Sequence, residues 1–347
     1  MSMETVLTMA LAMGRVLVLP PSQKMYLLGK TNFNFADFFP LQEISEEHRG
    51  LEIITTQQFL EETMGKLIDG KTGRVTFPPH NRTNWDGDQS GIKHALDPWL
   101  EAISENPNWN PTECIAAFPK SSSKEDTQAL TKAMAYILGQ ASGAKELEHI
   151  ALEYVGKPTP VDASTRDRLR EFLAGRDRLC IYDQTLQKAP IVHFHGKAKQ
   201  ETGGRLLVHF YAFLFFQDWK TQLWMNRFVR DHVRYIDDIQ CAAARIVHAI
   251  RTTKLQPSDQ GQYDAFHVRR GDFQYKKTRV SAEELVAAAE EEIPKGRTVY
   301  IGTDERHKEF FDPLKKHGWN ILFLDDFEDL LGDINKNHYG MIDQLIT

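Results

Sequence analysis

The chain has 347 residues, of which 41% are hydrophobic and 26% charged, and its formal net charge is −6. This length exceeds one ordinary hydrophobic core and predicts two domains of roughly 100 to 200 residues with a soluble globular composition. The negative charge argues against broad contact with nucleic acid or an anionic membrane, because both need a basic face.

The first elements are typical of the middle of an α/β domain. Apolar residues recur at helical spacing over residues 1–12, and residues 15–19 read as a buried strand that Pro20 and Pro21 stop. An α/β domain normally begins with a strand and a loop that carries a ligand at the helix N-terminus. We therefore expect that a first strand and its loop are missing.

Residues 71–111 have little periodicity and many Asn, Pro, Gly and Trp residues, so we expect an irregular excursion over the surface. Within it, the spacing from Asp86 to Asp97 is similar to a calcium-binding loop, and Asp86-Gly87-Asp88 matches a D-x-D metal motif. The flanking residues fit neither interpretation. Two prolines oppose the helix that would enter a calcium-binding loop, and no strand precedes the D-x-D motif. A hydrated turn is the favoured interpretation.

Three further elements are predicted in the middle of the chain. Residues 127–138 indicate a helix, residues 179–182 a strand, and residues 191–195 another short strand. His193 and His195 fall on one face of that last strand. With no acidic or cysteine partner nearby, ordinary packing is favoured over a metal site. Residues 227–251 then predict one long amphipathic helix that bridges the two halves.

The pattern becomes regular after residue 262. A helix with the capping box Ser281 to Glu284 separates the first two predicted strands, and a second helix ends near Lys316. The strands are residues 262–268, 297–301 and 320–324. This β-α-β-α-β spacing predicts a parallel sheet with right-handed crossovers. A final helix, residues 339–347, stops in mid-pattern, so we expect the sheet to be cut short.

Charged or polar residues follow each of these three strands. They are His267 with Arg269 and Arg270, Thr303 with Asp304, and Asp325 with Asp326. In a parallel sheet the carboxyl ends meet at one edge, where ligands bind, so we expect these side chains to converge. Paired arginines have the shape to fork onto phosphate oxygens. The sequence therefore predicts a diphosphate-binding edge.

Within this edge, Arg269 is our first choice for the phosphate, because it shares a strand face with His267. It could neutralise a departing β-phosphate without a metal, with Arg270 as a supporting partner. Asp304 has two interpretations: it caps the following helix, or it accepts the N1–H and N2–H groups of guanine.

Other functions are disfavoured. GxGxxG does not occur in the chain, which argues against a dinucleotide-dependent dehydrogenase. Arg270-Gly271-Asp272 spells an adhesion tripeptide, but the end of a buried strand displays it poorly.

Several segments taken in order resemble the GDP-fucose protein O-fucosyltransferase family, and most closely the type that modifies thrombospondin repeats. These segments are residues 14–21, 227–232, 267–273, 299–305 and 340–344. The resemblance implies an α/β, GT-B-like fold of two Rossmann-like domains whose parallel sheets face a cleft, each domain incomplete. Residues 1–225 would be the acceptor-side domain, and residues 226–347 the domain that binds the GDP-sugar.

The resemblance also implies an activity and roles for residues. The expected reaction is inverting, metal-independent transfer of fucose from GDP-fucose, a co-substrate rather than a cofactor, to a Ser or Thr hydroxyl of a protein. His267, the Val268 backbone and Arg269 match contacts to the nucleotide sugar, with Arg270 beside them. Arg269 matches the catalytic arginine that steadies the departing diphosphate, and Asp304 matches the aspartate that reads guanine.

Two departures from the family concern the ends of the chain. The family's glycine-rich loop, which carries an Asn and in one branch a glutamate proposed as general base, would precede residue 1. A later Ser-Thr-Phe segment would follow residue 347. We therefore expect truncation at both ends, and the alternative to an active transferase is a catalytically silent GDP-sugar-binding relative or a gene fragment.

Cysteine usage leaves the compartment open. Cys114, Cys180 and Cys241 are far apart and form no C-x-x-C pair, which disfavours a zinc knuckle and a redox motif. One disulfide would suit a secretory lumen, and three reduced thiols the cytosol. The resemblance implies the lumen of the endoplasmic reticulum or Golgi. We recognise neither a signal peptide nor the ~20 apolar residues of a membrane span.

Overall fold

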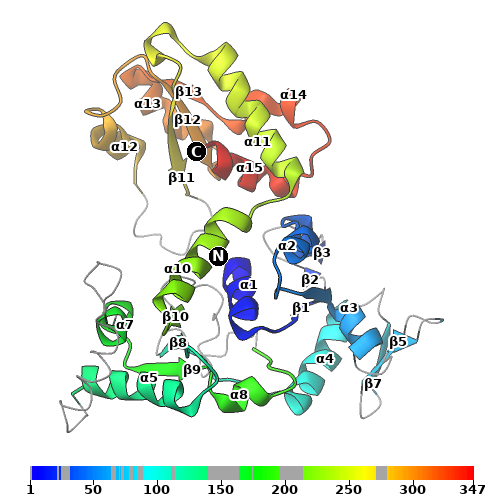
Figure 1. Ribbon diagram of the computed structural model, residues 1–347. Coiled ribbons are helices and arrows are strands. Elements are labelled where there is room, and N and C mark those ends of the chain that lie inside the picture. Colours follow the sequence, from blue (N-terminus) through cyan, green and yellow to red (C-terminus); the bar gives the residue numbers. More distant parts are fainter. Residues whose placement is uncertain are drawn as a thin grey trace. The chain divides into compact units, whose positions relative to one another are not determined.

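A computed structural model describes the following residues: 2–21, 23–24, 32–63, 68–69, 71, 74–77, 81–84, 89–110, 114–139, 164–173, 175–194, 214–270 and 280–347. The protein is a mixed α/β protein with parallel sheets (Figure 1). It divides into two compact units, the first formed by Met1–Ala36 with Pro40–Arg234 and the second by Asp37–Phe39 with Tyr235–Thr347.

The first unit contains two parallel sheets. Strand β1 (Leu17–Leu19) pairs with β4 (Ile53–Thr55), and β8 (Cys114–Phe118) lies between β10 (Leu214–Phe216) and β9 (Arg178–Ile181). Every residue of β8 is buried, as expected for a central parallel strand that is covered on both faces. The antiparallel pairs are β2 (Gln23–Lys24) with β3 (Asn32–Phe33), and β6 (Arg74–Phe77) with both β5 (Ile68–Asp69) and β7 (Asn81–Asn84).

Helices surround these strands. They are α1 (Ser2–Met13), α2 (Leu41–Glu47), α3 (Thr56–Gln58), α4 (Gln89–Ile103), α5 (Lys124–Ile137), α7 (Thr165–Leu173), α8 (Gln184–Lys188) and α10 (Trp219–His232), with the short turns η2 (Phe35–Asp37) and η3 (Phe59–Thr63). Apolar side chains of α5 and α7 pack on those of β8 and β10, where Ile115 and Phe215 are fully buried. The predicted elements at residues 1–12, 15–19, 127–138 and 179–182 are confirmed.

A disulfide joins Cys114 of β8 to Cys180 of β9, across a sequence separation of 66 residues. Cys241 is unpaired and exposed. The two cysteines meet because β8 and β9 are neighbouring parallel strands, in which Cys180 lies opposite Ala116.

Two predictions about the first unit are wrong. The surface excursion contains helix α4, whose Leu96 and Trp99 pack against Phe59 and Leu60. This packing stabilises a helix in a segment whose composition predicted an irregular loop. The predicted strand at residues 191–195 is only an isolated bridge between Glu105 and Val192. The Asp86-Gly87-Asp88 motif and His195 lie outside the described residues.

The long helix predicted over residues 227–251 is also wrong, because it is two helices. Helix α10 ends at His232 and α11 (Asp237–Ala249) begins after an extended segment. In that segment the N–H of Ile236 donates to the carbonyl of Phe38 at 3.0 Å, and two aspartates start α11, where the helix dipole favours negative charge. The units divide between Arg234 and Tyr235, whereas residue 225, the expected boundary, lies inside α10.

The second unit contains the predicted parallel sheet, which is confirmed with the order β11 (Asp264–Val268), β12 (Thr298–Thr303), β13 (Asn320–Leu322). Its helices are α11, α12 (Ala282–Ala289), α13 (Asp312–His317), α14 (Glu328–Leu331) and α15 (Tyr339–Ile346). Its short turns are η6 (Ile250–Lys254), η7 (Pro257–Asp259), η9 (Lys308–Phe311), η10 (Leu324–Phe327) and η11 (Lys336–His338). The capping box of Ser281 and Glu284 begins α12 as predicted.

The central strand β12 is the core of this unit. Val299 and Ile301 pack with Phe311, Leu314 and Trp319, together with apolar side chains of α12. Helices α11 and α15 lie side by side near the sheet (Figure 1), and α15 contacts β12 directly. Among the described residues no helix is long and apolar enough to span a membrane.

A buried carboxylate holds the start of β12. Asp259 of η7 is fully buried and accepts the N–H and the hydroxyl of Thr298 at 2.7 and 2.6 Å. It also accepts the N–H of Gln256 and lies 3.9 Å from Nε of Arg297. Burial alone raises the pKa of Asp259, but the bonds from Thr298 and Gln256, with Arg297, outweigh it and lower the pKa. The ionised carboxylate therefore anchors β12 to η7.

Replacing this carboxylate tests that anchor. We expect Asp259→Ala to lower the free energy of unfolding by about 3 to 5 kcal/mol, because several buried donors lose their acceptor. Chemical denaturation would measure this, with the exposed Asp333→Ala as control, expected within about 0.5 kcal/mol of the parent. Since the pKa is lowered, the loss is full at neutral pH and shrinks below pH 3.8. Equal losses in both variants would contradict the anchor.

Candidate functional site

The parallel register of β11 and β12 brings two strand ends together. Val268 lies opposite Thr303, so the residues after them leave the sheet at the same edge. There Arg269 Nε lies 3.7 Å from Asp304 Oδ2, and the backbone N–H of Arg270 donates to Asp304 Oδ1 at 2.6 Å. The predicted convergence of the arginine and the carboxylate is confirmed.

Arg269 and Asp304 are accessible. Half of the Arg269 side chain and about a third of that of Asp304 are exposed, at 50% and 36%. An ion pair at this exposure contributes little to stability, because water screens it and both side chains lose freedom. The pair is therefore more suited to exchange its partners for a ligand than to hold the fold together.

Arg270 has a different environment. Its guanidinium lies 3.1 Å from Glu305 Oε2, donates to the carbonyl of Val280 at 2.9 Å and stacks 3.7 Å from the ring centre of Phe310. The backbone N–H of His307 lowers the pKa of Glu305, and the bond from Arg270 lowers it further. These contacts fix the direction in which the chain leaves β11, and they occupy the guanidinium that we expected beside the diphosphate.

The two other predicted residues of β11 alternate in direction. His267 is exposed, whereas Val268 is 5% exposed and packs in the core. This alternation is consistent with His267 and Arg269 sharing a strand face, as the sequence predicted. The Val268 carbonyl accepts the hydroxyl of Thr303 at 2.6 Å, which ties the two strand ends together.

The acids after the third strand make local contacts. Asp325 lies 3.6 Å from Lys308 Nζ, and Asp326 accepts the N–H of Phe323 at 2.7 Å at the start of η10. These bonds order the chain around η9 and η10. The site is thus built from the ends of β11 and β12, with Asp325 and Asp326 in local structural roles.

Sequence reasoning missed the carboxylate that supports this edge. Asp343 of α15 accepts the hydroxyl of Tyr300 at 2.6 Å and the N–H of Thr303 at 2.8 Å. Burial raises the pKa of Asp343 despite both bonds, and burial followed by the nearby Asp343 raises the pKa of Tyr300. The signal in the sequence was the segment 340–344, which contains Asp343 and resembles the family, but no role for this aspartate was inferred from it.

Close packing accompanies this support. A Cβ atom on Gly302 would lie 2.8 Å from Thr347 Cγ2 and 3.4 Å from Asp343 Cγ. A side chain at this position would require Thr347 to move and would press on Asp343. Gly302 therefore lets Asp343 reach the backbone directly before Asp304.

An α/β protein that presents an arginine and a carboxylate at the carboxyl edge of a parallel sheet is consistent with a glycosyltransferase fold. Comparison with protein families matches residues 1–347 to O-FucT, GDP-fucose protein O-fucosyltransferase. The chain belongs to this family. A search of curated proteins and a search of solved structures found no match.

The anchored arginine makes a stability prediction. We expect Arg270→Ala to lower the free energy of unfolding by about 1 to 2 kcal/mol, through loss of the stacking on Phe310 and of the pair with Glu305. Arg270→Lys should recover only part of this, since one ammonium cannot make the same set of contacts. Chemical denaturation measures both, with exposed Arg306→Ala as control. A loss no larger than that of the control would contradict the anchoring.

Proposed function

We propose that this chain transfers fucose from GDP-fucose to a Ser or Thr hydroxyl of a protein acceptor, by an inverting and metal-independent reaction. Membership of the O-fucosyltransferase family supports the donor and the reaction class. The observation that carries the proposal is the Arg269–Asp304 pair at the carboxyl edge of β11 and β12. The proposed architecture is GT-B-like, with the second unit binding the donor.

The chemistry assigned to Arg269 is electrostatic. The acceptor oxygen forms a bond to C1 of fucose while the bond from C1 to the β-phosphate oxygen breaks, and the electron pair leaves with GDP. The proton of the acceptor hydroxyl passes to water or to a general base. A guanidinium within hydrogen-bond distance of that phosphate stabilises the charge as it develops. Arg269 is the proposed catalytic residue, because its half-exposed side chain lies at this edge.

Asp304 is the proposed guanine reader. One of its oxygens already accepts the Arg270 N–H, and the other faces Arg269. In GDP the ribose and the α-phosphate separate the base from the β-phosphate. Donor binding therefore requires the pair to open, with Arg269 moving to phosphate and guanine replacing it beside Asp304. His267 and the Val268 backbone are proposed as further donor contacts.

Arg270 takes a supporting part in this proposal. Its guanidinium is engaged by Glu305, Val280 and Phe310, so it acts by setting the path of the chain beside the neighbouring Arg269. The different contacts of Arg269 and Arg270 therefore support a role in ligand binding for Arg269 and a structural role for Arg270.

The proposed compartment is the lumen of the endoplasmic reticulum or Golgi. The disulfide between Cys114 and Cys180 supports an oxidising environment, since disulfides persist there and are rare in the cytosol.

Nucleotide binding tests the role of Arg269. We expect GDP to bind in the presence of EDTA, and Arg269→Ala to weaken binding about 10- to 100-fold, the cost of one or two charge-assisted hydrogen bonds. Isothermal titration calorimetry would measure the affinity. The control is Arg245→Ala, which removes an exposed arginine on α11. Tight GDP binding by Arg269→Ala would contradict the assignment.

An activity assay with the same protein distinguishes sugar transfer from nucleotide binding. Incubation with GDP-fucose and a folded thrombospondin-type repeat should release GDP and add fucose with inverted configuration at C1. Mass spectrometry would detect the added fucose, and NMR would determine the configuration at C1. GDP binding without transfer would favour the catalytically silent relative over the enzyme.

Base selectivity tests Asp304. We expect the parent to prefer GDP to ADP, and Asp304→Asn to reduce that preference by about tenfold or more, because its amide places a donor against a guanine donor. The measured quantity is the ratio of the two dissociation constants, which a general weakening of the site leaves unchanged. An unaltered ratio would remove Asp304 as the guanine reader.

A further inference from the structure

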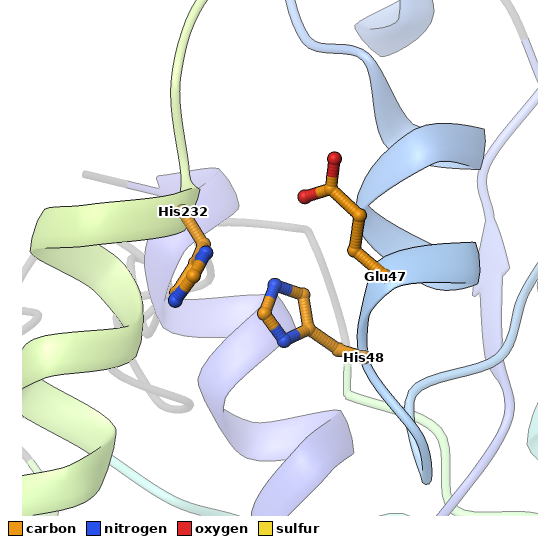
Figure 2. A group of neighbouring side chains, drawn as sticks. All are labelled: Glu47, His48 and His232. Carbon is orange, nitrogen blue, oxygen red and sulfur yellow. The ribbon is translucent and has the colours of Figure 1, made fainter.

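Three potential metal ligands meet in the first unit, outside the proposed donor site. Glu47 ends α2, His48 follows it, and His232 is the last residue of α10. One ligand atom from each of these residues lies within 4.8 Å of the other two. Figure 2 shows the three side chains reaching the same space from two helices, with a ring nitrogen of His48 facing the gap between Glu47 and His232.

One ring nitrogen of His48 lacks a hydrogen-bond partner. Its Nε2 atom is buried and has no hydrogen-bond partner. Its ring packs edge-on against Phe228 at 4.9 Å and against His232 at 4.2 Å between ring centres. A buried polar atom without a hydrogen-bond partner destabilises the folded state. A bound ligand that contacts this nitrogen would remove that cost.

The positive charge of Arg234 reaches His48, so a bound cation requires Arg234 to be held by a carboxylate other than Glu47. Arg234 lies 3.5 Å from Glu47 Oε1, but it lies equally close to Glu43 Oε2. Glu43 therefore offers Arg234 a second carboxylate, and Glu47 retains its other oxygen for a ligand.

We propose that Glu47, His48 and His232 bind a zinc(II) ion that joins the end of α2 to the end of α10. Two imidazoles and one carboxylate form a ligand set that zinc accepts, with water as the fourth ligand. Bonds of about 2.0 to 2.1 Å place the ligands of a tetrahedral ion about 3.4 Å apart. The ligand atoms, which lie within 4.8 Å of one another, therefore need to approach by up to about 1.4 Å through rotation about side-chain bonds.

This site is independent of the proposed sugar transfer. Its ligands belong to the first unit, whereas Arg269 and Asp304 belong to the second. The ion stabilises the helix ends and takes no part in breaking the bond from fucose to phosphate. Removal of zinc should therefore lower the melting temperature without weakening GDP binding.

The test uses the full chain, freed of metal with a chelator and then dialysed. Zinc chloride is titrated by calorimetry into the parent and into His48→Gln, His232→Gln and Glu47→Gln. The matched control is Glu46→Gln, which removes an exposed carboxylate from the same helix. Cobalt(II) serves as a second probe, because its visible absorption reports tetrahedral coordination by protein ligands.

We expect the parent and Glu46→Gln to bind one more zinc ion than either histidine variant, and Glu47→Gln to bind it at least about tenfold more weakly. Zinc should raise the melting temperature of the parent and of the control more than that of the three ligand variants. Glu47→Gln changes a half-exposed side chain, so it decides the matter if a histidine variant fails to fold. The same zinc stoichiometry, affinity and cobalt spectrum in the parent, Glu47→Gln and Glu46→Gln would overturn the proposal.

Discussion

The parallel pairing of β11 with β12 is the constraint on which the rest of the second unit depends. Hydrogen bonds between the strands set Val268 opposite Thr303, and both chains leave the sheet directly after that pair. An arginine and an aspartate that are far apart in sequence therefore lie 3.7 Å apart at one edge. A slip of one residue in this register would turn every side chain of the strand to the other face.

Two carboxylates, of which Asp259 is fully buried, hold β12 at both ends. Asp259 accepts two bonds from Thr298 at the start of the strand, and Asp343 accepts one from Tyr300 and one from Thr303 near its end. Buried polar groups favour a single arrangement when every donor has its acceptor, and they are costly when one partner is absent. The position of Asp304 therefore depends on the hydrogen bonds that Asp259 and Asp343 accept from β12.

The adjacent arginines illustrate how packing separates similar residues. Arg270 is held by Glu305 and Phe310 and is 24% exposed, whereas Arg269 is half exposed beside Asp304. A guanidinium that is already satisfied can orient its neighbour, and one in a weak exposed pair can change partners. The edge therefore combines a rigid support with an adaptable cation.

Much of the second unit could be predicted from the sequence alone. The capping box at Ser281, the strand spacing and the arginines after β11 are local patterns, and each arises from neighbours along the chain. Parallel topology then follows from the alternation of strands and helices. For the same reason the convergence of Arg269 with Asp304 could be expected before any coordinates.

Tertiary structure alone decided the features that depend on residues distant in sequence. The break between α10 and α11 comes with the bond of Ile236 to Phe38, and α4 is ordered by packing on Phe59 and Leu60. The Cys114–Cys180 disulfide and the meeting of His48 with His232 likewise join separate segments. Local sequence patterns do not reveal such contacts, because the contacts stabilise the protein only after folding has brought the distant partners together.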